Sequence, residues 1–546
     1  MLFKAFNSKG KQEKGETDSS YIYSHTHTHT HTTKHLTLLT KGKRSQSALE
    51  YMMTYGWAIL IIVIVAVILY SMGIFNPSSS VTFTSSGFSP FTVSSSLCNN
   101  IGYKIAVIAG PIPNNANSLT INKVFVTSAT GANATTASYT LTNPVTLKSG
   151  QSATILIPNV ACNAANVHYS LSAKIEYSYT AGTLGLQYVN TSGTVAGTSI
   201  TGKPSVLTAY EPITITNSQS SATPNPFQQM INFTSSDPGF SSIATGNFGQ
   251  NVEFFYYNGT VIPSWLENYT STNAIWWLKL GNIPAGSSET IYVGFAPTST
   301  NLFNTVNDGE APQLSSTYAE YDDGANVFNN YWNFAGISLP SPFIILGNKT
   351  ELTINNGITL NSSGSFISIE TNTVFPIDNI LEINLINPII SNEFSNGGGI
   401  MYALSRVDGI YNSTGVAVNG QGQWIYGGCT TSVLSGAACN FSLAQIGQQK
   451  EGIAHNSVEG SYGMVGNLTK SEIMGVVSES TGTYIYKNEA ILNSTTTVPP
   501  EGNYYIVVGA GGDLLSSKLE FSFNWLRTRA YPPNGVMPSV TFGSVA

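Results

Sequence analysis

The feature that most constrains this chain is a segment from Tyr51 to Tyr103 that contains no Asp, Glu, Lys or Arg. Its first part, Tyr51–Tyr70, is apolar and about 20 residues long, enough to span a hydrocarbon core as a helix. A secretory signal has a shorter apolar stretch followed by a small-residue cleavage site, whereas this run ends in YSMGIFNPSSS. Basic residues precede the run, in KGKR, so the positive-inside rule places the N-terminus in the cytoplasm. We therefore expect a single-pass membrane protein whose domains beyond residue 76 are extracellular.

The start of the run, KRSQSALEYMMTYGWAILIIVIV, resembles the class III signal peptide of archaeal type IV pilin-like proteins. The resemblance implies cleavage by a prepilin peptidase between Ser45 and Gln46, although the family most often has Gly before the cut. Glu50 would then be the fifth mature residue and an assembly residue, facing the α-amine of another pilin-like subunit. The alternative is that Glu50 is solvated at headgroup depth and that the helix only anchors the protein.

The segment before the run, residues 1–45, is expected to be a disordered, low-complexity leader. Its HTHTHTHT tract is of a kind that can bind metal, but a simple sequence repeat explains it better. The rest of the chain has 14 basic and 26 acidic side chains, a formal charge of −12. This charge argues against a nucleic-acid partner, which would require clustered Lys and Arg.

The composition indicates an extracellular β protein. Charged residues make up 9% of the chain and hydrophobic residues 42%, so Ser, Thr, Asn, Gln and Gly must build the surface. Every second residue from Tyr169 to Tyr177 is apolar, as in a half-buried strand. We predict a mainly β fold: one long hydrophobic helix at 46–76, then two or three antiparallel β-sandwich domains. The first domain, 77–203, is expected to be immunoglobulin-like.

Two further domains are suggested by resemblance. Residues 204–315 contain VEFFYY, PSWLENY, AIWWLKL and IPAGSSETIYVGFAP, and resemble an uncharacterised β-domain of secreted proteins. Residues 316–546 open with YAEYDDGANVFNNYWNFAG and close with KLEFSFNWLRTRAYPPNG, and resemble a concanavalin A-like lectin or glucanase sandwich. The resemblance implies a jelly-roll of two antiparallel sheets.

The four cysteines fall into two well-separated pairs. We predict disulfides Cys98–Cys162 and Cys429–Cys439 in an oxidising compartment, with buried free thiols as the alternative. No CxxC is present, and beyond the leader His168 and His455 are the only histidines, so the sequence does not indicate a zinc site.

The sequence lacks the usual catalytic patterns. The laminarinase-like sandwiches use Glu-x-Asp-x-x-Glu on one strand, but Glu382 is followed by Asn384, and Glu370 and Glu393 stand alone. No GxSxG motif is present. We therefore predict that the chain is not an enzyme and that it has no catalytic cofactor.

Binding features are more evident. Asp322 and Asp323 are candidate ligands of a structural calcium, with a solvated turn as the alternative. Trp332, Trp424 and Trp525 are either core residues or a platform for a sugar. Glycosylation sequons follow the helix. They occur at Asn133, Asn190, Asn232, Asn258, Asn268, Asn348, Asn361, Asn412, Asn440, Asn467 and Asn493.

Taken together, these features predict a pilin-like adhesin at the cell surface that binds a glycan or another surface partner. Its helix would anchor it in the membrane or assemble it into a filament. The alternatives are a monomeric membrane-anchored binding protein and a surface glycoside hydrolase. The sequence does not identify the ligand.

Overall fold

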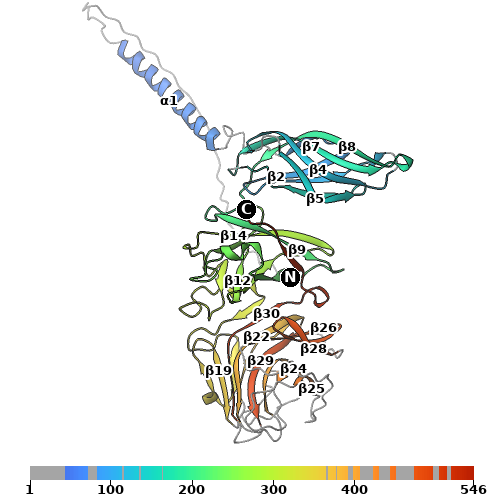
Figure 1. Ribbon diagram of the computed structural model, residues 1–546. Helices are drawn as coiled ribbons and strands as arrows, with labels where there is room; N and C mark the ends of the chain where they lie inside the picture. The colour runs from blue at the N-terminus through green and yellow to red at the C-terminus, as the bar shows by residue number, and fades with distance from the viewer. Residues whose placement is uncertain are drawn as a thin grey trace, which may run out of the picture. The chain divides into compact units, whose positions relative to one another are not determined.

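The computed structural model describes residues 44–71 and 83–546. The second range has gaps at 114–115, 134–136, 163, 364–366, 377, 392–397, 406–421, 429–442, 450–471, 496–502 and 513–517. The chain divides into two compact units, Met1–Asn76 and Pro77–Ala546. The fold is mainly β, with few helices (Figure 1).

The described part of the first unit is α1, Arg44–Ser71. Its described apolar side chains, such as Trp57 and Ile62, are exposed within this unit. None of the helices in the described residues meets the length and hydropathy needed to cross a membrane. The prediction of a single-pass membrane protein is therefore contradicted. The first turn of α1 reads RSQS and a carboxylate follows at Glu50, so polar residues occupy its N-terminal end.

The first region of the second unit, residues 83–203, is a sandwich of two antiparallel sheets (Figure 1). One sheet has the order β1 (Thr84–Gly87), β8 (Leu186–Thr198), β7 (His168–Thr180), β4 (Leu119–Thr130), β5 (Ala137–Leu147). The other has the order β2 (Phe91–Cys98), β3 (Tyr103–Ala109), β6 (Ser152–Ile157). The alternation predicted around Tyr169–Tyr177 is the buried face of β7. A disulfide joins Cys98 to Cys162 in the core, as predicted.

The middle region has two sheets of four strands each. The first has the order β10 (Phe227–Thr234), β13 (Asn273–Leu280), β12 (Ser264–Tyr269), β15 (Asp308–Glu310). The second has the order β11 (Val252–Phe255), β14 (Ser287–Phe295), β9 (Ala209–Asn217), β31 (Ser539–Phe542). The chain turns at Asn258–Gly259, where Gly259 has φ +81° and the Gly202 carbonyl oxygen lies against the place where a Cβ would stand. A residue with a side chain would therefore clash there.

The last strand differs from the sequence-based division, which placed everything up to residue 546 in the jelly-roll. β31 pairs with β9, with Val540 opposite Ile215 and Phe542 opposite Ile213. Its apolar residues Val540 and Phe542 pack against the core of the middle region. The third region is thus enclosed in sequence between strands that belong to the middle region.

The third region is built on two larger sheets that share one core. The first contains β18 (Leu352–Ile354), β19 (Ile358–Ser363), β30 (Lys518–Ala530), β22 (Asn379–Ser391), β26 (Glu472–Glu479), β27 (Gly482–Lys487) and β28 (Ala490–Thr495), with β16 (Asn330–Trp332) also paired to β30. The second contains β17 (Phe343–Gly347), β20 (Ile367–Thr371), β29 (Asn503–Gly512) and β21 (Phe375–Pro376), with β23 (Gly398–Ser405) also paired to β29. β24 (Gly422–Gly428) pairs with β25 (Leu443–Gln449), and α2 (Gly324–Val327) is a single short turn.

Candidate functional site

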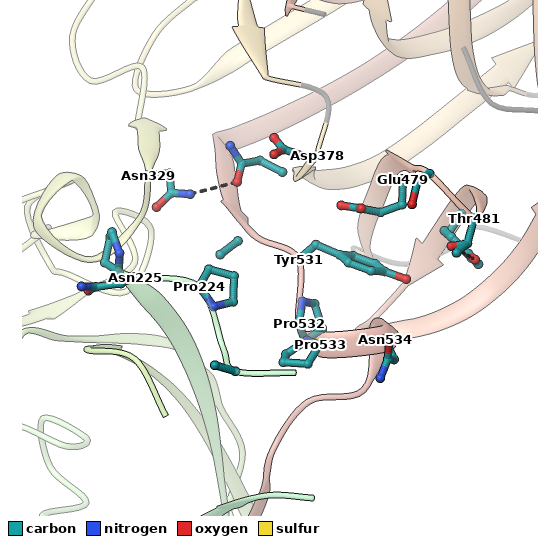
Figure 2. A pocket seen from close by; sticks show the side chains of 16 residues that line it. Pro224, Asn225, Asn329, Asp378, Glu479, Thr481, Tyr531, Pro532, Pro533 and Asn534 are labelled. Atoms are coloured by element: carbon teal, nitrogen blue, oxygen red, sulfur yellow. Dashed lines mark hydrogen bonds between the residues drawn. The ribbon is translucent and has the colours of Figure 1, made fainter. Parts of the chain in front are cut away.

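A pocket of about 710 Å³ lies where the middle and third regions meet (Figure 2). The middle region contributes its 222–226 segment, and the third region contributes the ends of three neighbouring strands, β30, β22 and β26. Figure 2 shows Pro224, Asn225 and Asn329 on one side of the pocket and Glu479, Thr481 and Tyr531 on the other. The pocket therefore needs both regions to be complete.

The register of the large sheet explains why these residues meet. β22 pairs with β30 so that Asn379 faces Ala530, and with β26 so that Leu381 faces Val476. Asp378 directly precedes β22, Tyr531 directly follows β30, and Glu479 is the last residue of β26. The three residues therefore stand at the ends of neighbouring strands, and all three line the pocket.

Two tyrosines form the aromatic part of the pocket. The rings of Tyr484 and Tyr531 are stacked, with centroids 6.0 Å apart and planes 28° apart. The hydroxyl groups of Tyr484 and Thr481 are 2.9 Å apart. Burial, reinforced by the neighbouring Tyr484, raises the pKa of Tyr531 to about 12, so its hydroxyl stays protonated and can donate a hydrogen bond. The pair presents a rigid aromatic surface with polar edges.

Glu479 is a carboxyl group of the pocket with altered acidity. Its partial burial, together with the charge of Asp378, raises its pKa from 4.5 to about 7. A carboxyl group in this range is protonated below neutral pH and can donate a proton. Asp378 itself is exposed to solvent.

Amide side chains hold the opposite wall of the pocket. Asn329 donates to the Asn379 side chain over 3.0 Å and accepts from Gln228 Nε2 over 3.1 Å. Asn534 donates to Gln219 Oε1 over 3.1 Å. These contacts join the middle region, which contains Gln219 and Gln228, to the third region, so they fix the two walls relative to each other.

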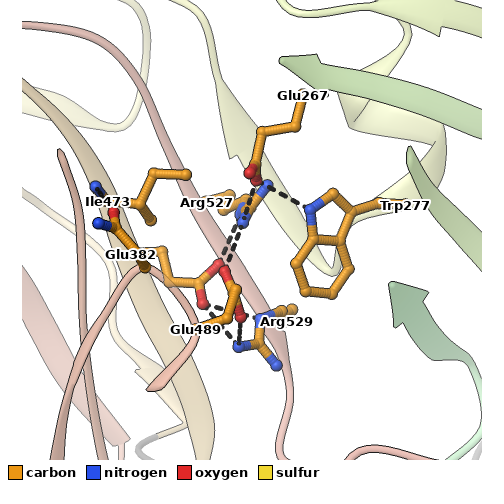
Figure 3. A network of polar contacts seen from close by, with 8 residues as sticks. Glu267, Trp277, Glu382, Ile473, Glu489, Arg527 and Arg529 are labelled. Atoms are coloured by element: carbon orange, nitrogen blue, oxygen red, sulfur yellow. Dashed lines mark hydrogen bonds and ion pairs between the residues drawn. The ribbon is translucent and has the colours of Figure 1, made fainter. Parts of the chain in front are cut away.

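A buried ionic cluster is built on the paired strands β22 and β30 (Figure 3). Arg527 contacts Glu382 over 2.6 Å, Glu267 over 2.7 Å and Glu489 over 3.3 Å. Arg529 contacts Glu382 over 2.8 Å and Glu489 over 2.5 Å. Glu267 is on β12 of the middle region, so the cluster connects the two regions through their buried interface.

The cluster is enclosed by aromatic rings. The Arg527 guanidinium lies 4.5–5.5 Å from the ring centroids of Trp265, Trp277, Phe328 and Trp525. Although burial favours the neutral acid, Arg527 and Arg529 hold the pKa of Glu382 below its ordinary value. For Glu489 burial prevails and raises the pKa to about 8. Buried charges of this kind require their partners, so the cluster is a structural connection between the regions.

Glu382 was considered from the sequence as a possible catalytic acid, but in the structure it is a buried counter-ion. Arg527, Arg529 and Tyr531 were not predicted as site residues. These three residues alternate with single residues in LRTRAY. This spacing could have indicated that they lie together, because alternate strand residues share a face.

The two predicted calcium ligands, Asp322 and Asp323, differ in their hydrogen bonding. Asp322 accepts hydrogen bonds from Trp265 Nε1, Tyr331 Oη and Asn333 Nδ2 over 2.8–2.9 Å. Asp323 is buried, and neither of its carboxylate oxygens has a hydrogen-bond partner among the described residues. No group of three His, Cys, Asp or Glu suited to a metal occurs in the described ranges. Calcium binding stays a prediction.

The other predicted residues are scattered. Ser45, Gln46 and Glu50 fall in α1, where processing and assembly stay predictions that N-terminal sequencing of the mature protein would test. Cys429 and Cys439 lie outside the described residues, as do Glu393 and His455. Trp525 is fully buried and Trp332 packs on the core of the third region, so neither is a free sugar platform. The side chain of Trp424 lies outside the described part.

The sequons are mostly accessible. Six have exposed asparagines: Asn133, Asn190, Asn232, Asn258, Asn268 and Asn348. Asn361 is half-buried on β19. Asn412, Asn440 and Asn467 lie outside the described residues, as does the side chain of Asn493. Glycosylation stays a prediction.

Comparison with known proteins finds one informative sequence relative. The chain is 29% identical over 367 residues to uncharacterized protein 562 of Sulfolobus islandicus rod-shaped virus 1. The match covers 61% of this chain and 59% of that protein, so the chain spans less than two thirds of its relative. No protein-family profile matches the chain.

Solved structures with partial similarity include two glucanase-related proteins. A β-1,3-glucanase from Mycobacterium marinum is 10% identical, with a TM-score of 0.27, and 37% of this chain covers 98% of it. A pseudo β-1,3-glucanase of Mycobacterium tuberculosis is 11% identical, with a TM-score of 0.28 and the same coverages.

Similarities this distant assign no activity to the chain. They do contradict the prediction that the chain is not an enzyme, since glycosyl hydrolases stand among the neighbours, and that prediction is withdrawn. That prediction rested on motifs within single segments, and their absence does not exclude acids that come together from different segments of the chain.

Proposed function

We propose that the chain is a carbohydrate-binding protein and that the pocket between its middle and third regions holds the saccharide. The observation that carries the proposal is the stacked pair Tyr484 and Tyr531, which lines the same pocket as carboxylate and amide side chains. A sugar ring has an apolar face that packs on an aromatic ring and hydroxyl groups that need hydrogen-bond partners. A pocket with both kinds of surface suits such a ligand.

The acceptors and donors are positioned on both walls. Asp378 and Glu479 offer carboxyl groups, Thr481 and the tyrosines offer hydroxyls, and Asn225 and Asn534 offer amides. Several of these side chains are held by neighbours, which lowers the entropic cost of binding. The pocket is not basic, because its lining contains no Lys or Arg. A neutral saccharide therefore suits it better than an anionic one.

The test is a binding screen of the full chain on an array of neutral hexose and N-acetylhexosamine oligosaccharides. We expect specific binding, and we expect Tyr531→Ala to weaken it at least tenfold, about 1.4 kcal/mol, in titrations with the best oligosaccharide. Tyr188→Ala is the matched control, since Tyr188 lies on β8 of the first region and is 66% exposed. Absence of binding by the wild-type chain, or equal loss in both variants, would refute the proposal.

A further inference from the structure

The first region leaves half of one strand without a neighbour on one side. β8 pairs with β7 along its whole length, as the long hairpin in Figure 1 shows. On its other side β1 pairs only with residues 193–196 of β8. Among the described residues, no strand pairs with this side of residues 186–191, which we call the open edge.

The hydrogen bond at the end of the open edge shows which backbone groups it presents. The backbone N–H of Phe88 donates to the carbonyl oxygen of Ser192 over 2.9 Å, so the backbone groups of Ser192 point away from β7. In an antiparallel sheet, every second residue directs its N–H and C=O to the same side. Leu186, Tyr188 and Asn190 therefore also direct their N–H and C=O groups away from β7. Each of the three residues offers one donor and one acceptor to an incoming strand.

The open edge lacks the features that normally prevent an edge from pairing with another strand, which are charges, proline, bulges or a very short strand. From Tyr177 to Gly202 the chain contains no Asp, Glu, Lys, Arg or Pro. The pairing of β7 with β8 has no register shift. By contrast, β5 at the opposite edge of the sheet contains Pro144, and its register shifts against β4. The open edge is thus the unprotected edge of this sheet.

Apolar side chains are grouped at the same end of β8. Leu184, Leu186 and Tyr188 are each more than half exposed. Single exposed apolar residues are common on protein surfaces, but a contiguous group of them marks an interaction site. The open edge therefore combines unpaired backbone groups with an apolar surface.

We propose that the open edge of β8 pairs in antiparallel fashion with the open edge of a second copy of this chain. Charge favours this place of contact between copies. The chain has a formal net charge of −7, so two copies repel each other unless the surfaces that meet are uncharged. The uncharged hairpin of β7 and β8 meets this condition.

The backbone also fits a second copy. A twofold axis at Tyr188 places Tyr188 opposite the partner's Tyr188 and Leu186 opposite the partner's Asn190. Each facing pair can then exchange both hydrogen bonds, so the three donors and three acceptors of each copy are all used. Such a twofold contact is closed and stops at a dimer. Because the paired segments are short, the contact is smaller than a standard interface, and we expect a dissociation constant in the micromolar range.

The first experiment is hydrogen exchange of the full chain at about 1 μM and about 100 μM. The amides of Leu186, Tyr188 and Asn190 should exchange about tenfold more slowly at the higher concentration. Those of Gln187 and Val189, which point to β7, should be protected at both concentrations. The chain is produced in a host that adds no N-glycan, because a glycan at Asn190 would cover the edge. Association through another surface, such as α1, would leave the three open amides unprotected and would overturn the proposal.

The second experiment uses charge across the proposed axis. Tyr188→Lys and Tyr188→Glu should each abolish the concentration-dependent protection, because like charges would face each other. An equimolar mixture of the two variants should restore it, which a variant that fails to fold would not do. Ile337→Lys is the matched control: it makes the same change at an exposed apolar residue of the third region and should keep the protection.

Three results would overturn the proposal. The first is a wild-type chain whose open amides stay unprotected at the higher concentration, which would leave the edge to a strand of another protein. The second is unchanged protection in Tyr188→Lys. The third is a mixture of the Lys and Glu variants that does not recover protection.

Discussion

Raising the pH from 4 to 9 is expected to destabilise the unit that contains residues 77–546, because it buries carboxyl groups without counter-ions. Asp308 is 4% exposed and Asp323 is 1% exposed. Among the described residues, Oδ1 of Asp308 and both carboxylate oxygens of Asp323 have no hydrogen-bond partner. Burial, with repulsion from Glu253, raises the pKa of Asp308 from 3.8 to about 8. Burial, with repulsion from Asp322 and Asp308, raises that of Asp323 to about 9.

The sign follows from proton linkage. In the folded chain these groups keep their protons to higher pH than in the unfolded chain. Their contribution to the free energy of unfolding is therefore complete below about pH 4. It is lost progressively as the pH rises through about 8 and 9. Each pKa unit corresponds to about 1.4 kcal/mol, which gives an upper bound of about 6 kcal/mol for Asp308. Glu382 works in the opposite direction, because its lowered pKa removes stability when the pH falls below its ordinary value.

The assay is urea unfolding of the full chain at pH 4, 6, 8 and 9, followed by tryptophan fluorescence. We expect the free energy of unfolding to decrease by several kcal/mol between pH 4 and 9. Asp308→Asn and Asp323→Asn should flatten this decrease, while Glu176→Gln, on β7 of the first region, should leave it intact. A stability that is constant or rises from pH 4 to 8 would refute the reasoning.

Three other perturbations follow from the fold. Arg527→Met should destabilise the chain by about 3–5 kcal/mol, since it removes the counter-ion of the buried Glu267 and one of the two arginines that contact Glu382; urea unfolding measures this, and a loss below 1 kcal/mol would contradict it. Removing residues 536–546 should increase hydrogen exchange in β9 of the middle region, its partner in the sheet, and unchanged protection of Ile213–Ile215 would contradict the observed pairing. Reducing Cys98–Cys162, which closes a loop of 64 residues, should destabilise the first region by about 4 kcal/mol, and an unchanged Tm after reduction would contradict this.

Local features of the fold were predictable from the sequence because they depend on neighbouring residues. The alternation from Tyr169 to Tyr177 predicted the buried face of β7. The pairing of Cys98 with Cys162 followed from the spacing of the cysteines. The mainly β composition predicted the fold class.

What the sequence did not reveal depends on contacts between distant segments. β31 carries the same alternation that any edge strand would, and nothing local tells which sheet it completes. The pocket joins Pro224 to Tyr531, and it becomes visible only once the pairing of β22 with β30 and β26 is known. Glu382 looked like an isolated acid because its partners, Arg527 and Arg529, are far away in sequence.

The measurement that tests the account most directly is a crystal structure of the full chain with the best-binding array oligosaccharide. We expect a sugar ring packed on Tyr531, within hydrogen-bond distance of Glu479 and Asp378, in the pocket between the middle and third regions. A saccharide bound elsewhere on the chain, with this pocket free of it, would contradict the central claim.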